Sequence, residues 1–224
     1  NVKEKVGVDI QTASIDADNI PDLIHLINKL NPKVVLNVAL PYQDLTIMDA
    51  CISTKTHYID TANYEHPNEA MFEYKKQWAK NDDFKTSNLT ALLGSGFDPG
   101  VTGVFVKYIE ETYLDTIEYI DIMDCNAGDH GYPFATNFNP EINLREVSAN
   151  GKYWEEGKWI ETKPLEIKVN HNYPEIGFKT SYLLYHEELE SLTKNIKGLK
   201  RIRFFMTFGD SYIAHMNCLQ NVGM

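Results

Sequence analysis

The sequence lacks any run of about 18 apolar residues, the length that a membrane-spanning helix needs. Its first residues, NVKEKVGVDIQ, lack the apolar core of a signal peptide. Cysteine is also scarce, because Cys51, Cys125 and Cys218 are odd in number and far apart. These absences disfavour membrane proteins and disulfide-rich secreted domains, and they predict a reduced, cytoplasmic protein.

Positive charge is in deficit. The 21 Lys and Arg residues face 32 Asp and Glu residues, which gives a net charge of −11. This balance disfavours nucleic acid and anionic membranes as partners, since both bind clustered Lys and Arg. It is compatible with a cationic substrate. Only Arg145, Arg201 and Arg203 offer the guanidinium fork that suits a carboxylate, and surface charge is the simpler interpretation for the last two.

The first half of the chain alternates between short apolar runs and amphipathic stretches. Strands are expected at 8–16, 34–40, 57–60 and 88–94, and helices at 20–30, 43–55, 68–80 and 100–112. The run VVLNVAL at 34–40 is typical of a parallel strand that is covered on both faces. This order predicts an α/β fold with a Rossmann-like, doubly wound parallel sheet.

After about residue 114 strands dominate. Strands are expected at 115–124, 164–171, 177–185 and 200–208, with a helix at 186–196 and a hairpin at 152–161 that turns at Glu156-Gly157. We therefore predict a dinucleotide-binding domain over 1–113 and a second α+β domain with a mixed sheet over 114–224. The first domain is expected to be partial, because no G-x-G-x-x-G turn precedes residue 18, and the chain is expected to be a fragment of a longer protein.

Three strand ends, ALPYQD, DTANYE and GSGFDPG, should meet at one edge of the parallel sheet, where such folds bind ligands. The plainer interpretation of GSGFDPG is a tight turn in which Asp98 caps a helix and Pro99 takes its first position. The cofactor-facing positions expected at these ends are Ala39, Leu40, Pro41, Thr61, Ala62, Gly96, Phe97, Asp98 and Pro99.

The polar stretch DCNAGDHGYPFATNFNPE, at 124–141, has three functional interpretations. A metal site would use Cys125 and His130 with His171 or His186, but a lone C-x4-H pair is weak support and we predict no metal. A nucleophilic Cys125 would need His130 as its base. A polar binding wall is preferred, although the side chains of such a loop often satisfy their own backbone. Its carboxylates for a cation are Asp124, Asp129 and Glu141, and its amides are Asn126, Asn137 and Asn139.

Several longer segments carry a resemblance to a known family. They are NVALPYQDLTIMDAC, HYIDTANYE, LLGSGFDPGVTGVF, DCNAGDHGYPFATNFNPEINLREVSANGKYWE, LLYHEELESL and RIRFFMTFGDSY. Together they resemble the carboxynorspermidine (carboxyspermidine) dehydrogenase family of the saccharopine dehydrogenase-like superfamily. The resemblance runs nearly from end to end, and the 124–154 block is the most specific part of it.

This resemblance implies an oxidoreductase in polyamine biosynthesis that uses NADPH. L-Aspartate β-semialdehyde and a diamine, putrescine or 1,3-diaminopropane, would form an imine that is then reduced. His130 or His186 would be the acid–base group, and relatives suggest a homodimer. The implied substrate-binding residues are Asp124, Cys125, Asn126, Asp129, Asn137, Glu141 and Arg145. A saccharopine-type enzyme acting on lysine, or a truncated binding module, are the alternatives.

Overall fold

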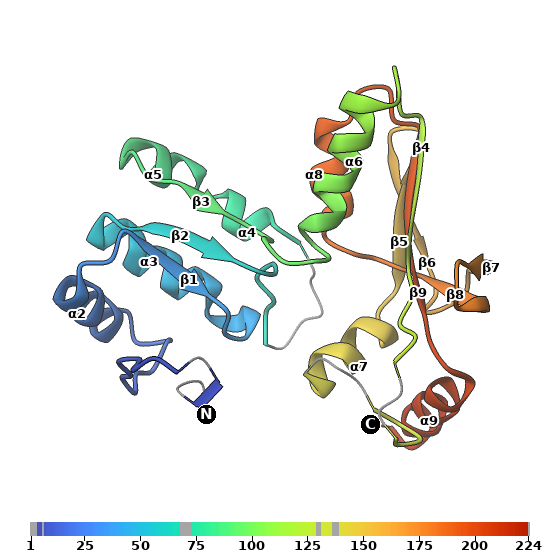
Figure 1. Ribbon diagram of the computed structural model, residues 1–224, viewed down its shortest axis with the longest axis horizontal. Coiled ribbons are helices and arrows are strands. Elements are labelled where there is room, and N and C mark those ends of the chain that lie inside the picture. Colours follow the sequence, from blue (N-terminus) through green and yellow to red (C-terminus); the bar gives the residue numbers. More distant parts are fainter. Residues whose placement is uncertain (1–3, 6, 68–72, 129–130, 136–138, 224) are drawn as a thin grey trace.

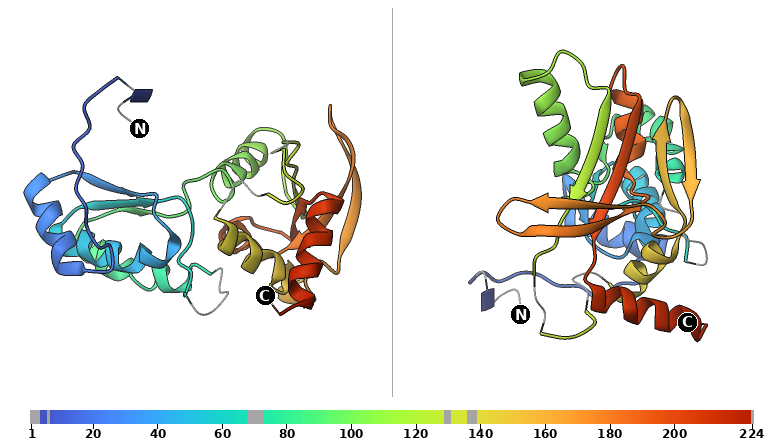
Figure 2. Two further views of the ribbon diagram at one scale, coloured as in Figure 1. Left: turned by 90° about the horizontal axis from the view of Figure 1, so that it is seen from below. Right: turned by 90° about the vertical axis from the view of Figure 1, so that its right-hand side faces the viewer.

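The computed structural model describes residues 4–5, 7–67, 73–128, 131–135 and 139–223. They form two lobes that lie side by side (Figures 1 and 2). One lobe holds a three-stranded parallel sheet in the order β1-β2-β3, and the other holds a six-stranded mixed sheet. No helix among the described residues is long and apolar enough to cross a membrane. The predicted combination of an α/β domain and an α+β domain is confirmed.

The three-stranded sheet consists of β1 (Val34–Asn37), β2 (His57–Asp60) and β3 (Ala91–Leu92). Helix α2 (Ile20–Leu30) packs on α3 (Asp44–Thr54), which follows the short 3-10 turn η1 (Pro41–Gln43) and lies against β1 and β2. Helices α4 (Lys75–Trp78) and α5 (Asn81–Thr86) precede β3. The core between helices and sheet centres on Met48, Ala50, Cys51 and Tyr58.

Local chemistry fixes the ends of α2. The side chain of Asn19 accepts a hydrogen bond from the backbone N–H of Asp22, and Pro21 lies in the first turn. Asn31 ends the helix in the left-handed region, with φ at 47°. The expected start and stop of this helix are both observed.

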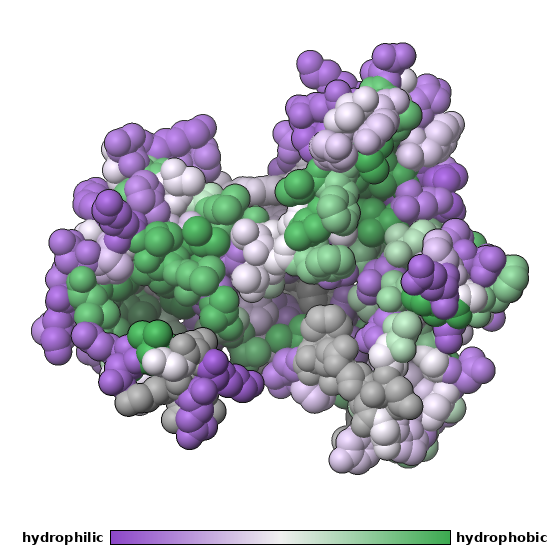
Figure 3. Space-filling view, viewed as in Figure 1, coloured by the Kyte–Doolittle hydropathy of each residue, from purple (hydrophilic) through white to green (hydrophobic). Residues whose placement is uncertain are grey.

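Two expectations for this half are wrong. Residues 8–16 form no strand, and only one face of β1 is covered by described elements. Val34, Leu36 and Val38 remain 43%, 60% and 70% exposed, which appears as an apolar area on this lobe in Figure 3. Of the expected helix at 68–80, residues 68–72 lie outside the described residues, and α4 covers Lys75–Trp78 of the remainder.

The second lobe is built on β9 (Arg201–Thr207). Along one edge β9 pairs in parallel with β4 (Tyr119–Asp124), and it pairs antiparallel with β5 (Gly151–Glu155) and β8 (Gly177–Leu184). The sheet continues to β6 (Lys158–Thr162) beyond β5, and to β7 (Lys168–Tyr173) beyond β8. Glu156 and Gly157 both have positive φ, as a tight hairpin turn requires. The expected hairpin and mixed sheet are therefore confirmed.

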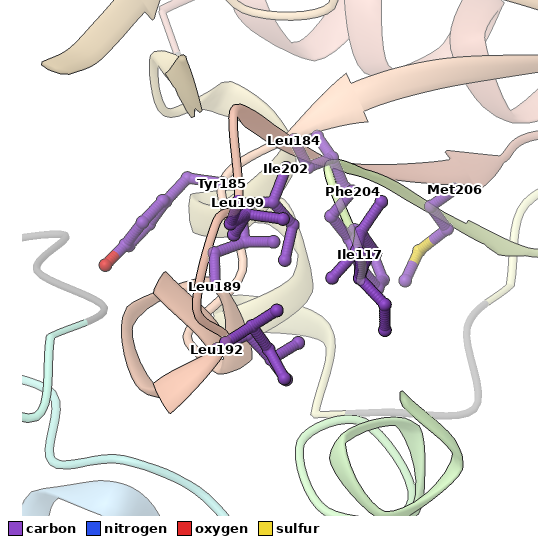
Figure 4. Packing of buried hydrophobic residues seen from close by; sticks show 11 residues of the cluster. Ile117, Leu184, Tyr185, Leu189, Leu192, Leu199, Ile202, Phe204 and Met206 are labelled. Atoms are coloured by element: carbon purple, nitrogen blue, oxygen red, sulfur yellow. The ribbon is translucent and has the colours of Figure 1, made fainter. Parts of the chain in front are cut away.

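Helices complete this lobe. Helix α8 (Glu188–Asn195) covers the sheet with Leu189 and Leu192, which pack on Leu184, Ile202 and Phe204 (Figure 4). Helix α6 (Val101–Thr112) lies beside α8 (Figure 1), so it contacts the second lobe although the predicted first domain ends at residue 113. That boundary stays a prediction. Helices α7 (Pro140–Ser148) and α9 (Asp210–Asn221) flank the other end of the sheet.

A candidate active site between the two sheets

The carboxyl ends of β1, β2 and β3 meet at one edge and form a wall of a cavity of about 440 Å³, where the surface is hollowed between the lobes (Figure 3). All nine positions expected to face a cofactor line this cavity, from Ala39–Pro41, Thr61–Ala62 and Gly96–Pro99. The opposite wall comes from α7 and from the joint between β8 and α8. The volume lies in the usual range for small-molecule sites.

The third strand end depends on a glycine. A Cβ on Gly96 would lie 2.9 Å from the backbone oxygen of Thr61 and 3.1 Å from that of Pro99. Only glycine therefore lets these two loops approach so closely. Helix α6 begins at Val101 with Gly100 as its N-cap, so the expectation that Asp98 caps the helix is wrong. Asp98 lines the cavity instead, because Pro99 and Gly100 lie between it and the first residue of the helix.

His186 lies at the centre of the opposite wall, 7% exposed, with its ring stacked on Phe204 at 4.2 Å between centroids. Its Nδ1 contacts the carboxylate of Glu188 in a short hydrogen bond and lies 3.4 Å from Oε2 of Glu187. Its Nε2 lies 3.8 Å from Oε1 of Glu146, which α7 contributes. The oxygen of Glu188 that does not contact His186 accepts a hydrogen bond from Thr102.

These charges shift the proton affinities of the whole group. Burial by itself would lower the pKa of His186, but Glu187, Glu188 and Glu146 raise it well above 6.5. Burial raises the pKa of Glu187 to about 7 and that of Asp98 to about 6, although His186 opposes both shifts. The site therefore holds an imidazolium beside acids that titrate near neutral pH, a combination that is typical of proton transfer.

A metal ion is the alternative use of this group. His186, Glu187 and Glu188 each offer one ligand atom, and these atoms lie within 4.8 Å of one another. A protonated imidazole has no free lone pair to bind a metal ion, and that of His186 already donates to Glu188. We therefore treat the group as a proton site.

The polar stretch after β4 lines an adjoining cavity of about 540 Å³, which shares Phe97, Asp98, Asn143 and Met206 with the first. Asp124, Cys125 and Asn126 face this second cavity. Asp129, His130 and Asn137 lie outside the described residues. The predicted wall is thus brought to the site only in part.

Two asparagines of the polar stretch satisfy nearby backbone groups, as the side chains of a loop often do. The side chain of Asn126 accepts from the backbone N–H of Gly128, and that of Asn139 accepts from Glu141 and Ile142 and so caps α7. Glu141 is exposed in the first turn of α7 and does not line either cavity.

Arg145 is held by the other lobe. Its guanidinium donates to the backbone oxygens of His66 and Pro67 and to the hydroxyl of Tyr42, at 2.9 to 3.3 Å. It also lies 3.1 Å from Oε1 of Glu65. These contacts join α7 to the loops after β1 and β2, and Arg145 does not line either cavity. Arg201 and Arg203 both pair with Asp121 across β4 and β9.

A second buried network lies behind the strand ends. Asn37 donates to Asp44 at 2.7 Å, and Gln77 donates to Asp60 at 2.7 Å and to Asp44 at 3.4 Å. Asp60 also accepts from the backbone N–H of Gly94. Burial, the first cause, raises the pKa of Asp44 to about 8 and that of Asp60 to about 6. This network holds β1, β2 and β3 at a fixed spacing below the cavity.

Sequence reasoning missed Glu65, Asn143, Glu146 and Glu188. Glu146 follows Arg145 on α7, and the pair Glu187-Glu188 follows His186 directly, so the motif HEE was the available signal. Glu65 ends DTANYE, one of the three strand ends expected at the ligand-binding edge, so its position was the available signal. Asn143 carried none, because only the packing of the two lobes brings it to the cavity.

Two family models match the chain in succession. The saccharopine dehydrogenase NADP binding domain matches residues 1–92, and the saccharopine dehydrogenase C-terminal domain matches residues 96–224. The chain belongs to the saccharopine dehydrogenase family. The resemblance that the sequence motifs suggested is thereby confirmed, and the cavity lies where the two family domains meet.

Curated relatives refine this placement. Carboxyaminopropylagmatine dehydrogenase of Synechocystis is 56% identical over 96% of this chain and 54% of its own length. Carboxynorspermidine synthases of Vibrio cholerae and Vibrio alginolyticus are 38% and 35% identical over 96% of this chain and 53% of their own lengths. This family member spans about half the length of those proteins.

The fold has a counterpart among solved structures. Apo saccharopine dehydrogenase (L-Glu forming) from Saccharomyces cerevisiae matches 99% of this chain and 49% of its own, with a TM-score of 0.71 at 14% identity. At this identity the likeness shows a shared fold.

Proposed function

We propose that this protein takes part in polyamine biosynthesis as an NADPH-dependent oxidoreductase that joins L-aspartate β-semialdehyde to a short cationic amine. The observation that carries the proposal is the cavity itself. It places an imidazolium among carboxylates directly opposite the strand ends of an NADP binding domain. The names of three relatives at 35–56% identity support the same reaction class.

The residues of the cavity fit both parts of this chemistry. The loops at Ala39–Pro41 and Gly96–Pro99 offer small and apolar groups against which a nicotinamide ring would lie. The bound nicotinamide would supply hydride to the imine carbon. Asp98, Glu146 and Glu187 line the same space and would attract the amine as a cation.

Proton transfer is assigned to His186 and Glu187. Imine formation requires a neutral amine, and a carboxylate whose pKa is about 7 can accept the proton of the bound ammonium at neutral pH. Loss of water from the adduct requires a proton donor near the departing hydroxyl. His186 is held as the imidazolium, so it can donate that proton.

Two kinds of amine are candidates. The sequence motifs point to the diamines putrescine and 1,3-diaminopropane, and the two Vibrio relatives are named carboxynorspermidine synthases. The name of the 56% identical Synechocystis relative instead contains agmatine, which carries a guanidinium in place of the second ammonium. Lysine, the substrate of saccharopine-type chemistry, would add a carboxylate to a cavity whose described charged lining is mostly acidic.

The test is NADPH oxidation by the full-length protein, followed by absorbance, with aspartate β-semialdehyde and each amine in turn. Oxidation that requires both the aldehyde and agmatine or a diamine, with the condensed product seen by mass spectrometry, is expected. Oxidation only with lysine would assign the protein to saccharopine-type chemistry. No oxidation with any amine would favour a binding module without catalysis.

A further inference from the structure

Glu65 is a buried acceptor in the cavity wall. It follows β2, is 1% exposed, and lines the same cavity as His186. Neither of its carboxylate oxygens has a hydrogen-bond partner among the described residues. A carboxylate that loses its water without gaining donors is costly, so such a group is uncommon unless a ligand completes it.

Arg145 balances the charge of Glu65 without satisfying it. Its Nη2 lies 3.1 Å from Oε1 but makes no hydrogen bond with it, and that nitrogen donates to the backbone oxygen of His66. The other terminal nitrogen, Nη1, donates to the backbone oxygen of Pro67 and to the hydroxyl of Tyr42. The acceptor sites of Glu65 therefore have no hydrogen-bond donor among the described residues, and burial raises its pKa although Arg145 opposes that shift.

We infer that Glu65 receives the distal cation of the amine substrate, and that two unpartnered oxygens on one carboxylate favour a planar guanidinium over an ammonium. This inference rests on the proposed function and names the substrate class of its site. A guanidinium donates two parallel N–H groups to one carboxylate, whereas an ammonium has no such fork. Leu40, Pro41 and Ile142 line the same cavity and can contact the methylene chain between the two ends.

A binding experiment separates this inference from the reaction. Agmatine, putrescine and n-butylamine, which lacks a distal cation, are titrated calorimetrically into the full-length protein with NADP⁺ present. Wild-type protein should bind agmatine at least about tenfold more tightly than n-butylamine, with putrescine between them. Glu65→Gln should weaken agmatine binding by about tenfold or more and change n-butylamine binding less than about twofold.

Glu73→Gln is the matched control. Glu73 also forms an ion pair between the lobes, with Nζ of Lys152 at 3.3 Å, but it does not line the cavity. Its variant should change the affinity for all three amines by less than about twofold. This control separates recognition of the amine from the loss of an ion pair between lobes.

Each other outcome is decisive. If Glu65→Gln weakens all three amines equally, or if the wild type binds agmatine no better than n-butylamine, the inference is overturned. Equal binding of putrescine and agmatine would overturn the preference for a guanidinium. If the wild type turns over agmatine but the Glu65→Gln variant binds agmatine as tightly as the wild type, only the inference is rejected. The expected binding pattern without turnover would reject only the proposed reaction.

Discussion

The two lobes bury carboxylates in different ways. In the parallel-sheet lobe, Asp44 and Asp60 are surrounded by the neutral amides of Asn37 and Gln77. In the mixed-sheet lobe, carboxylates surround His186. Amides supply hydrogen bonds but no charge, so burial raises the pKa of Asp44 to about 8 and the group holds its proton.

The imidazolium supplies both hydrogen bonds and charge. It keeps ionised carboxylates beside an open cavity, and Glu187, with a pKa of about 7, can gain or lose a proton near neutral pH. The comparison teaches that the partner of a buried carboxylate decides its use. Neutral partners make a structural brace, and a titratable cation makes a site that can transfer protons.

Removal of the imidazolium should give the largest effect. His186→Gln is expected to lower kcat by roughly 10²- to 10⁴-fold, the usual contribution of acid–base catalysis, because it removes the proton donor of the cavity. The pH profile of kcat should also change shape. His171→Gln, at an exposed position on β7, is the control and should leave kcat within about twofold. A folded His186→Gln protein with a normal pH profile would make the cluster a second structural brace.

Arg145 tests how the two lobes are joined. Arg145→Met keeps the length of the side chain but leaves Glu65 buried without a counter-charge, so the free energy of unfolding should fall by about 2–3 kcal/mol in urea titrations. Arg203→Met breaks an ion pair with Asp121 inside one lobe and nearer the surface, and it should cost about 0.5–1 kcal/mol. Equal losses would mean that the contact between lobes adds little.

Asp44→Asn tests the amide-bound pair. The folded pKa of Asp44, about 8, lies above the ordinary value of 3.8, so the folded protein keeps a proton that the unfolded chain releases. The free energy of unfolding of the wild type should therefore fall as the pH rises from about 4 to about 8. In the variant this fall should be smaller by up to about 5 kcal/mol, since each pKa unit between 3.8 and about 8 is worth about 1.4 kcal/mol. An unchanged slope would place the titration elsewhere.

Asp98→Asn should give the smallest of these effects. Burial raises the pKa of Asp98 to about 6, so its carboxylate is charged only above that pH. The wild-type kcat/KM for the amine should rise with pH through about 6 if that charge attracts the cation. The variant should lose this limb and about tenfold in kcat/KM, equivalent to about 1.4 kcal/mol. If the variant keeps the rise of kcat/KM with pH, that rise belongs to another acid, such as Asp124.

Much of the fold followed from local chemistry. Asn19 and Asn31 bound α2 because a capping side chain and a left-handed residue act within a few positions of the chain. The expectation that the strand at 34–40 is covered on both faces failed for a different reason. The apolar run fits a strand with two covered faces, but coverage depends on distant elements that the run itself does not encode.

The candidate site was foreseen unevenly. The strand ends could be located because parallel strands place their carboxyl ends at one edge. His186 was recognised as a candidate, but its contact with Glu146 could not be predicted, because the two residues lie on elements that are far apart in the sequence. Substrate binding by Arg145 stays a prediction. Its contacts between the lobes were not expected, since sequence does not show which acceptors lie within reach of a guanidinium.

The sequence by itself determined the family, the order of helices and strands, and the three loops that form one wall of the cavity. These properties depend on short-range patterns and on motifs that survive in the linear order of residues. Only the tertiary structure decided which carboxylates carry charge, which arginine already has partners and which buried carboxylate has no hydrogen-bond donor. Those properties depend on burial and on distances between atoms from separate elements, and the folded chain alone sets both.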